Sequence, residues 1–415
     1  MLKRIRYQIS LGLLVGVVLP VLIRQLMFSL PFYVTTHLVT IFGSVIAIIL
    51  GYLGYRRMLL FPGISSGGYA ITSLTITFSA LVLIMFVLRL DYTRLQMASS
   101  YILSVATLLF IHLKFERSRE FFFSYVPGGL AGELAHVPNV RWHRIETPDT
   151  ELKGEDAVVV DLHVDHDPRW ESAITKWVLA GIPLYDARLA KEQLTGRVEI
   201  NHLYENTLGS LNPNNVLLKA KSVLDFFISA LLILLLLPIM IVIAMLIKLD
   251  SPGPAIFRQR RMGFRAKPFT VYKFRTMYAA GETRDAEALL QSAMTKDGDA
   301  RITRFGRILR RTRLDELPQL FNILRGDMSL IGPRPEAVAL SEWYETQIPF
   351  YHYRHIIKPG LTGWAQVNQG HVTDVNDVRE KLNLDFYYVK NYSIWLDILI
   401  ALRTIAIVFT GTGAR

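Results

Sequence analysis

No cysteine occurs in this sequence of 415 residues, and acidic residues are fewer than basic ones. The first absence excludes disulfide bonds, thiolate catalysis and cysteine-ligated metals, and it fits a protein that faces the cytoplasm. The second gives a formal charge of +11, from 46 basic and 35 acidic residues. Because the basic residues accompany apolar stretches, we expect anionic lipid headgroups and phosphorylated substrates as partners, and no nucleic acid.

Charged residues are also scarce in four stretches of the N-terminal region, at about 9–23, 33–55, 69–88 and 97–113. Each is long enough, or nearly so, to cross a hydrocarbon core of about 30 Å. Hydrophobic residues make up 51% of the chain, so we expect a membrane protein in which residues 1–115 form four transmembrane helices. Basic residues flank alternate ends of these helices, which places the N-terminus and everything just after residue 114 in the cytoplasm.

Residues 116–210 change character and are typical of a small α/β module. The runs DAVVVDLHV (156–164) and GIPLYDA (181–187) predict strands on either side of a helix at 169–180, which together make one βαβ unit. A further strand, a glycine turn and a helix start are expected in 121–135. Because the Gly-x-Gly-x-x-Gly spacing is missing, a structural or oligomerisation role, including a homodimer, is favoured over nucleotide binding.

The most apolar stretch, 223–248, has two features that argue against a simple membrane crossing. Pro238 removes a helical hydrogen bond in its middle and bends the helix. Both flanks are basic, whereas a crossing helix usually has one flank that is poor in positive charge. We therefore expect a re-entrant hairpin helix that enters and leaves from the cytoplasmic face, with an ordinary kinked span as the alternative. Asp225, near the entry, should pair with Lys221 one turn earlier.

The segment 301–336 places two adjacent carboxylates, Asp315 and Glu316, between two predicted helices. Apolar residues recur at helical intervals in 302–309 and again in 317–324. Two interpretations are open: the carboxylates could simply cap the second helix, or they could act on a phosphorylated, anionic substrate. Successive helical residues point about 100° apart, so two neighbouring carboxylates can serve different partners only at a helix end.

Basic residues surround this segment. Residues 249–313 contain fifteen Lys and Arg against six Asp and Glu. One guanidinium group can donate two parallel hydrogen bonds to the oxygens of a phosphate. We therefore expect some of these residues to bind a diphosphate or a lipid phosphate. After the carboxylates, GPRP (332–335) predicts a rigid turn. The candidate substrate-binding residues are Arg260, Lys273, Arg275, Arg310, Arg311, Arg313, Arg334 and Glu336.

Three blocks of the chain strongly resemble one known family. FRQRRMGFRAKPFTVYKFRTM (257–277), LRRTRLDELPQLFNILRGDMSLIGPRPE (309–336) and KPGLTGWAQVN (358–368) resemble the bacterial sugar transferase family. These proteins are monotopic phosphoglycosyl transferases, and the longer members initiate exopolysaccharide or O-antigen synthesis on undecaprenyl phosphate. The resemblance extends from about residue 217 to the C-terminus.

The resemblance implies a reaction and roles for residues. A UDP-sugar, commonly UDP-glucose or UDP-galactose and alternatively an acetamido sugar, would give its sugar 1-phosphate to undecaprenyl phosphate and release UMP. Asp315 would attack the phosphorus and carry a covalent phosphosugar, while Glu316 would bind Mg²⁺ or act as a base. Asp315 and Glu316 are thus the candidate metal ligands. Ser229 and Pro238 would belong to a re-entrant helix, and 116–210 would be a truncated Rossmann-like domain.

The predicted fold class is a membrane protein with α and α/β parts. Four transmembrane helices and the Rossmann-like module precede a mainly helical monotopic catalytic domain at 217–415, on the cytoplasmic face of a bacterial inner membrane. The last helix, 394–410, should lie on the membrane surface because Asp397 and Arg403 interrupt it.

Two other functions remain open. A non-catalytic polysaccharide-assembly scaffold would not need the LDE and GPRP blocks together. A lipid-linked sugar flippase would need a polar path through many spans, whereas the predicted spans carry little charge.

Overall fold

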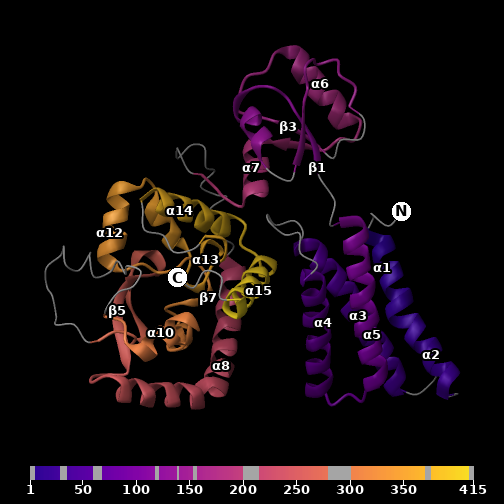
Figure 1. The fold of residues 1–415 in the computed structure, drawn as a ribbon. Coiled ribbons are helices and arrows are strands. Elements are labelled where there is room, and N and C mark those ends of the chain that lie inside the picture. Colours follow the sequence, from indigo (N-terminus) through magenta and orange to yellow (C-terminus); the bar gives the residue numbers. More distant parts are fainter. Residues whose placement is uncertain are drawn as a thin grey trace. The chain divides into compact units, whose positions relative to one another are not determined.

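The computed structural model describes residues 5–28, 35–58, 68–116, 121–137, 140–152, 157–199, 215–278, 301–369 and 375–410 (Figure 1). The chain divides into two compact units, Met1–Gly196 and Arg197–Arg415. The first unit contains a helical bundle and an α/β module. The second unit contains the sequence blocks that resemble sugar transferases.

The helical bundle forms from the four stretches that are poor in charge. In the first unit, helices long and apolar enough to cross a membrane occupy Ile5–Gln25, Thr35–Arg57, Tyr69–Val87 and Arg94–Lys114, at the four predicted stretches; Val216–Asp250 in the second unit is a fifth such helix among the described residues. They pack around a core that includes the fully buried Ile48, Leu74 and Leu108, while many large apolar side chains stay exposed on the outer faces, as in a membrane-embedded bundle. The elements are α1 (Ile5–Leu13), a π-helical turn η1 (Leu14–Val18), α2 (Leu19–Phe28), α3 (Thr35–Met58), α4 (Gly68–Val87), α5 (Arg94–Ile111) and a π-helical turn η2 (His112–Glu116).

The α/β module is a parallel sheet of four strands in the order β2-β1-β3-β4. The predicted βαβ unit is confirmed as β3-α6-β4, and Asp167 starts α6 by accepting a hydrogen bond from the Arg169 main-chain nitrogen. The sequence pattern does not predict β2, because this edge strand is only partly buried and has no apolar run. The elements are β1 (Phe121–Tyr125), a 3₁₀ helix η3 (Gly129–His136), β2 (Val140–Arg144), β3 (Ala157–Val160), α6 (Pro168–Leu179), β4 (Leu184–Asp186) and α7 (Ala187–Thr195).

The second unit combines helices with short strands. A two-stranded antiparallel hairpin, β5-β6, and a two-stranded parallel sheet, β7-β8, are its only sheets among the described residues. The elements are α8 (Asn215–Asp250), β5 (Ile256–Met262), η5 (Phe264–Ala266), β6 (Pro268–Phe274), α10 (Arg304–Arg311), η6 (Leu314–Glu316), α11 (Gln319–Leu324), β7 (Ser329–Ile331), α12 (Val338–Gln347), η7 (Tyr351–Ile356), β8 (Gly360–Thr362), α13 (Trp364–Asn368), α14 (Val375–Lys390) and α15 (Ile394–Thr410).

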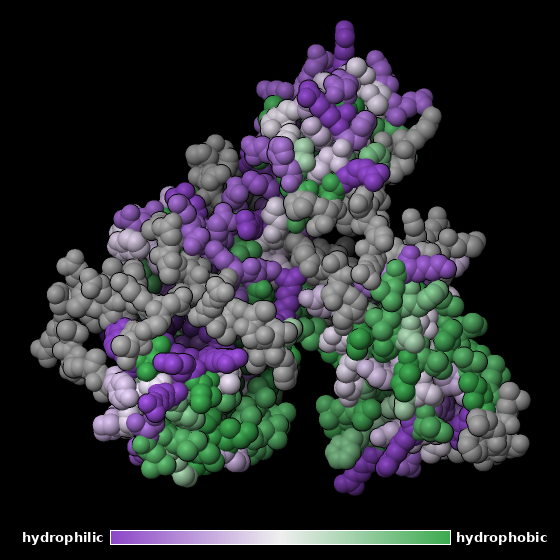
Figure 2. Space-filling model, viewed as in Figure 1, coloured by the Kyte–Doolittle hydropathy of each residue, from purple (hydrophilic) through white to green (hydrophobic). Residues whose placement is uncertain are grey.

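Helix α8 bends, as its internal proline predicts. It has 36 residues with Pro238 inside, and Figure 1 shows two arms that meet at an angle. Before the proline, Leu232 and Ile233 pack in a cluster with α11 and β6. After it, Ile243 and Ile247 pack in a cluster with α10 and β6. Both arms therefore rest on one body, and Figure 2 shows hydrophobic side chains gathered over this part of the unit.

The C-terminal helix α15 is part of the core of this unit. Its residues Leu396, Leu399 and Ile400 are fully buried. Asp397, one of the charges that suggested a membrane-surface helix, forms an ion pair with Lys221 of α8. Other residues of α15, such as Ile405, stay exposed, so contact with a membrane surface through that face remains a prediction.

Candidate active site

The β5-β6 hairpin positions two of the basic residues of the candidate site. Its antiparallel register pairs Phe257 with Lys273 and Arg261 with Phe269. Paired residues share a face of the hairpin, and successive residues alternate between faces. Lys273 and Arg261 therefore lie on the same face, and Arg260 lies on the other.

The two carboxylates lie on the short turn after α10. Arg313 has a φ of +58°, in the left-handed region, and its conformation redirects the chain from α10 into the 3₁₀ turn η6. Leu314 and Leu317 fix this turn by packing in the same cluster as Phe274 of β6. Apolar contacts thus hold Asp315 and Glu316 beside the hairpin.

Glu316 is buried and surrounded by positive charge. Its side-chain Oε1 accepts hydrogen bonds from Lys273 Nζ at 3.1 Å and Arg334 Nη2 at 3.0 Å, and Arg313 Nη1 lies 3.8 Å away. Burial alone would raise the pKa of Glu316, but Arg334, Lys273 and Arg313 outweigh it and hold that pKa well below the usual range. Glu316 is therefore ionised.

Asp315 is equally buried but has a different environment. Only 9% of it is exposed, and its Oδ1 has no hydrogen-bond partner among the described residues. Burial and the neighbouring Glu316 raise its pKa, against the opposing charges of Lys273, Arg334 and Arg313. The two carboxylates thus have separate environments: Glu316 pairs with basic side chains, and Asp315 has a buried oxygen without a hydrogen-bond partner among the described residues. Strongly perturbed pKa values of this kind cluster at functional sites.

The alternative interpretation, in which the carboxylates cap the following helix, is wrong. Helix α11 starts after Pro318, and no side chain makes a capping hydrogen bond there. Asp315 and Glu316 belong to a separate 3₁₀ turn that precedes this helix. Helix capping therefore does not explain their position.

The turn at 332–335 brings Arg334 to Glu316. A Cβ on Gly332 would lie 2.4 Å from the main-chain oxygen of Lys358, so only glycine fits between β7 and the residues before β8. The oxygen of Pro335 accepts a hydrogen bond from Arg261 Nη1, and the oxygen of Arg334 accepts one from Arg354 at 2.9 Å. Contacts on both sides of the turn thus fix the main chain at Arg334, and the guanidinium donates to Glu316.

Behind Arg334 lies a layer of buried ion pairs. Arg354 and Asp385 are almost fully buried, with Nη2 and Oδ2 2.7 Å apart. Glu336, a predicted substrate-binding residue, instead pairs with Lys381, their Oε1 and Nζ atoms being 2.5 Å apart. Its carboxylate is therefore already paired, and substrate binding by Glu336 stays a prediction.

Other predicted binding residues lie elsewhere. The prediction for Arg275 is wrong: it is 7% exposed, and its guanidinium donates to the main-chain oxygens of Pro254 and Ser251, each at 2.6 Å, which closes the end of α8. The structure does not bring Arg260 to Glu316, because it is exposed on the opposite face of β5. Arg310 donates to Thr276 Oγ1 at 2.9 Å and Arg311 is exposed on α10, so their binding of phosphate stays a prediction.

The predicted binding residues leave out Arg261, although it belongs to the same basic segment as Arg260, and sequence reasoning missed the ion pairs behind Arg334. Strand alternation indicates that Arg260 and Arg261 face opposite ways, but it does not say which of them shares a face with Lys273. Arg354, Asp385 and Lys381 come from α14 and η7, and no sequence pattern links them to the carboxylates.

Asp225 connects α8 to this body in a way that corrects the predicted pair. Lys221 contacts Asp397 Oδ2 at 2.5 Å and not Asp225. Asp225 Oδ2 accepts a hydrogen bond from Ser329 Oγ of β7 at 2.6 Å. Ser229 is fully buried and donates to the main-chain oxygen of Phe226. These polar groups at the start of α8 thus have partners.

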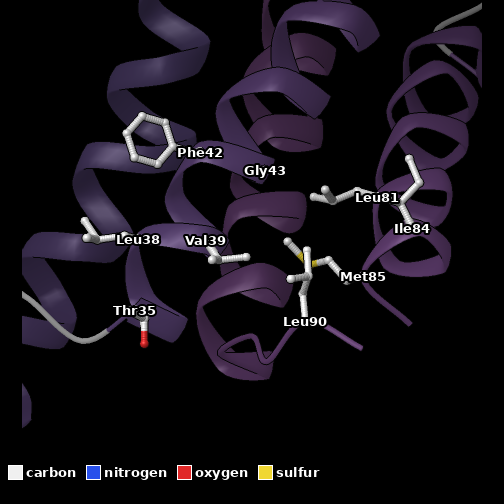
Figure 3. A pocket seen from close by; sticks show the side chains of 9 residues that line it. All are labelled: Thr35, Leu38, Val39, Phe42, Gly43, Leu81, Ile84, Met85 and Leu90. Carbon is white, nitrogen blue, oxygen red and sulfur yellow. The ribbon is translucent and has the colours of Figure 1, made fainter. Parts of the chain in front are cut away.

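Two further features do not compete with this site. In the α/β module, Asp161, His163 and Asp186 have ligand atoms within 4.8 Å of one another, but both aspartates accept main-chain hydrogen bonds that hold the glycine turn and start α7. These hydrogen bonds indicate that Asp161 and Asp186 have a structural role. In the bundle, a cavity of about 380 Å³ between α3 and α4 is lined almost entirely by apolar side chains (Figure 3).

Comparison with known proteins identifies relatives of this chain. A family model described as bacterial sugar transferase matches residues 216–411. The chain is 40% identical, over 98% of its length and 95% of the relative, to a UDP-N-acetylgalactosamine-undecaprenyl-phosphate N-acetylgalactosaminephosphotransferase from Aeromonas hydrophila. It is 45% identical, over 47% of its length and 71% of the relative, to a UDP-glucose:undecaprenyl-phosphate glucose-1-phosphate transferase from Caulobacter vibrioides.

A relative of the same name from Escherichia coli is 40% identical over 52% of this chain and 44% of the relative. The matched region of the family model contains the carboxylates, Lys273 and Arg334. Together with the match along almost the whole length of the Aeromonas relative, this shows that the chain belongs to the bacterial sugar transferase family.

Proposed function

We propose that this protein transfers a sugar 1-phosphate from a UDP-sugar to undecaprenyl phosphate, as the first membrane step of exopolysaccharide or O-antigen synthesis. One observation carries the proposal: a buried carboxylate oxygen of Asp315 has no partner among the described residues, beside a Glu316 that holds cations. The names of the relatives, which are undecaprenyl-phosphate sugar phosphotransferases, support the same reaction.

Two displacements at phosphorus make up the proposed reaction. First, a carboxylate oxygen of Asp315 bonds to the sugar-bearing phosphorus, and the bond from that phosphorus to the oxygen of UMP breaks, so that UMP leaves with the electron pair. Second, an oxygen of undecaprenyl phosphate bonds to the same phosphorus, and the bond to Asp315 breaks. The carboxylate is restored, and undecaprenyl-diphosphate-sugar is the product.

The main obstacle to this reaction is the repulsion between the negative oxygens of Asp315, the UDP-sugar and undecaprenyl phosphate. The basic side chains around Glu316 reduce that repulsion. Lys273, Arg334 and Arg313 supply positive charge in a poorly solvated place, where it stabilises negative charge on phosphoryl oxygens most strongly. The low pKa of Glu316 makes it a weak base. We therefore propose that Glu316 positions the side chains of Lys273, Arg334 and Arg313 and does not remove a proton.

Mg²⁺ is the expected cofactor, and the donor set is compatible with it. Proteins commonly bind Mg²⁺ through one or two carboxylates together with substrate phosphates, and Asp315 Oδ1 is a carboxylate oxygen with no partner among the described residues. Glu316 is less available, because Lys273 and Arg334 already contact its Oε1. When bound there, the ion would neutralise charge on the diphosphate.

Our proposal includes a re-entrant path for α8. At about 1.5 Å per residue, a straight helix would separate Asp225 from Ser251 by about 39 Å, more than the roughly 30 Å hydrocarbon core. Yet Asp225 contacts Ser329, and Ser251 contacts Arg275, within one packed unit. The test uses the absence of cysteine: single cysteines at Lys219 and Arg258 should react with an impermeant thiol reagent from the same side. Reaction from opposite sides would mean a kinked span.

The sugar is best tested with donors named by the relatives. The relative that matches along almost the whole chain is named for N-acetylgalactosamine, and relatives that match about half of the chain are named for glucose. UDP-N-acetylgalactosamine, UDP-glucose and UDP-galactose therefore come first in the panel.

The deciding experiment measures nucleotide release from purified protein with undecaprenyl phosphate, Mg²⁺ and this panel, with and without the lipid. We expect UMP with one donor, and about one equivalent of sugar phosphate retained on the protein when the lipid is omitted. Release of UDP would indicate an ordinary glycosyl transferase. No release from any donor would favour the scaffold or the flippase.

A matched pair of variants tests Asp315. Asp315→Asn should abolish turnover and leave folding and membrane insertion intact, because it removes only the nucleophile. Glu345→Gln, at an exposed carboxylate, should keep the wild-type rate. A rate near wild type in the Asp315 variant would overturn its assignment.

A further inference from the structure

Three polar side chains from three helices meet near one end of the membrane bundle. Arg24 of α2 contacts His37 Nδ1 of α3, and its Nη1 lies 3.4 Å from Oε1 of Gln96 in α5. His37 and Gln96 are only 5% and 3% exposed. Charged and polar side chains inside a membrane bundle are rare and commonly mark a function.

This cluster has hydrogen-bond donors in excess. The described partners of Arg24 are an imidazole nitrogen and an amide oxygen, and no carboxylate forms an ion pair with it in the described part of the chain. The Nε2 of Gln96 is buried without a partner among the described residues. Rotating this amide by 180° would not help, because Arg24 would then face a donor.

The nearby sequence offers no missing anion. The segment between α2 and α3, residues 29–34, contains no Asp or Glu. The link between α4 and α5 has one carboxylate, Asp91, which is exposed and has basic residues on either side, Arg89 and Arg94. The cluster lies toward the end of the bundle opposite the N-terminus, where Figure 2 shows hydrophilic residues. The apolar cavity at this end (Figure 3) supplies no counter-charge either.

Helix packing alone does not account for the cluster. Polar residues that join membrane helices usually satisfy one another. Here Gln96 also hydrogen-bonds to His37, but its Nε2 has no acceptor among the described residues, and the Arg24 guanidinium contacts only neutral acceptors there. One anion placed between α2, α3 and α5 would satisfy both. The arrangement therefore indicates a bound anion that the described residues do not supply.

The expected depth of the cluster in the bilayer indicates which kind of anion binds there. Helix α3 has 24 residues, which makes it roughly 36 Å long against a hydrocarbon core of roughly 30 Å. His37 and Gln96 are each the third residue of their helix. The cluster therefore lies at the boundary of the core, where the phosphate groups of lipids are found.

We propose that Arg24 and Gln96 bind the phosphate group of an anionic membrane phospholipid at this end of the bundle. Basic pockets between membrane helices are known to take such headgroups. A net anionic lipid fits better than a zwitterionic one, because the cluster has no carboxylate to receive an ammonium group. The site is independent of Asp315 and its reaction.

The test uses the full-length protein in detergent, with phosphatidylglycerol, phosphatidylcholine or inorganic phosphate added. We expect phosphatidylglycerol to raise the unfolding midpoint and to remain bound in native mass spectrometry, and the other two to have little effect. Arg24→Gln should weaken phosphatidylglycerol binding by about tenfold or more, since a hydrogen bond to a charged group is lost. Gln96→Leu, which keeps the charge and removes the amide, should weaken it to a smaller extent.

Two controls make the result specific. Gln25→Leu changes an exposed neighbour, and Arg57→Gln removes an exposed charge from the opposite end of α3; both should keep wild-type binding. An unfolding midpoint close to that of the wild type, measured for each of the four variants without added lipid, verifies that they fold. Equal stabilisation by phosphatidylcholine or by inorganic phosphate would overturn the proposal, as would wild-type phosphatidylglycerol binding in both Arg24→Gln and Gln96→Leu.

Discussion

Replacement of Lys273 by methionine removes one positive charge from the active site and tests how much that charge contributes to the rate. Its Nζ lies 3.1 Å from Glu316 Oε1, and the side chain is only 15% exposed. A hydrogen bond between charged groups contributes about 1.5–3 kcal/mol, and about 1.4 kcal/mol corresponds to a tenfold change in rate. We therefore expect Lys273→Met to lower kcat/KM for UMP release by about 10- to 150-fold.

The same side chain should set the alkaline limb of the pH profile. Burial, together with Arg334 and Arg261, lowers the pKa of Lys273 to about 8, against the opposing effect of Glu316. Because only the protonated lysine carries the charge, wild-type kcat/KM should fall as pH rises through about 8. Stability should change in the opposite direction. Above that pH the folded protein binds fewer protons at Lys273 than the unfolded chain does, so this group adds stability as pH rises toward 10.5.

Two variants separate this account from a general loss of structure. Lys273→Arg keeps the charge at high pH, so its alkaline limb should move to higher pH even if its rate is reduced. Arg260→Met removes an exposed charge from the opposite face of the hairpin and should leave both rate and profile unchanged. An alkaline limb at the same pH in Lys273→Arg would refute the reasoning, as would a Lys273→Met enzyme within twofold of wild type.

Three further outcomes are expected. Arg354→Met leaves Asp385 buried without its partner and should destabilise the fold by about 3–5 kcal/mol, lowering the unfolding midpoint; adding Asp385→Leu should recover most of the loss, and no recovery would contradict the pairing. Gly332→Ala places a methyl group 2.4 Å from a main-chain oxygen and should reduce the folded fraction in size-exclusion chromatography, whereas Gly132→Ala, with nothing within 4 Å, should not. Chelation of divalent cations should stop UMP release and leave the unfolding midpoint unchanged, because the ion pairs of Glu316 persist; release that continues would argue against Mg²⁺.

Local sequence pattern was sufficient for most helices and for the βαβ unit. Apolar stretches predict the bundle, and a proline inside α8 predicts its bend, because these features depend on residues close together in the chain. The pairing of Lys221 shows where such reasoning fails. An acidic partner four residues away is available, yet the lysine contacts Asp397, 176 residues later in the chain.

The sequence likewise predicts some features of the candidate site and not others. Asp315, Glu316, Lys273 and Arg334 are all identified in the sequence as candidates, and the structure brings them together. The type of residue does not reveal the direction of a side chain, however. Arg275 has the same guanidinium as Arg334, but it turns to main-chain oxygens at the end of α8.

That contact has a mechanical consequence. Arg275 fastens the end of α8 to the chain two residues after Lys273, the ammonium that contacts Glu316. A thinner or thicker bilayer acts on a membrane-embedded helix through hydrophobic mismatch. On the re-entrant path that we propose, α8 is such a helix, and Arg275 joins its end to the active site by a short, buried connection. We expect turnover to vary with the acyl-chain length of the surrounding lipid, so that this enzyme responds to the thickness of its membrane as well as to its substrates.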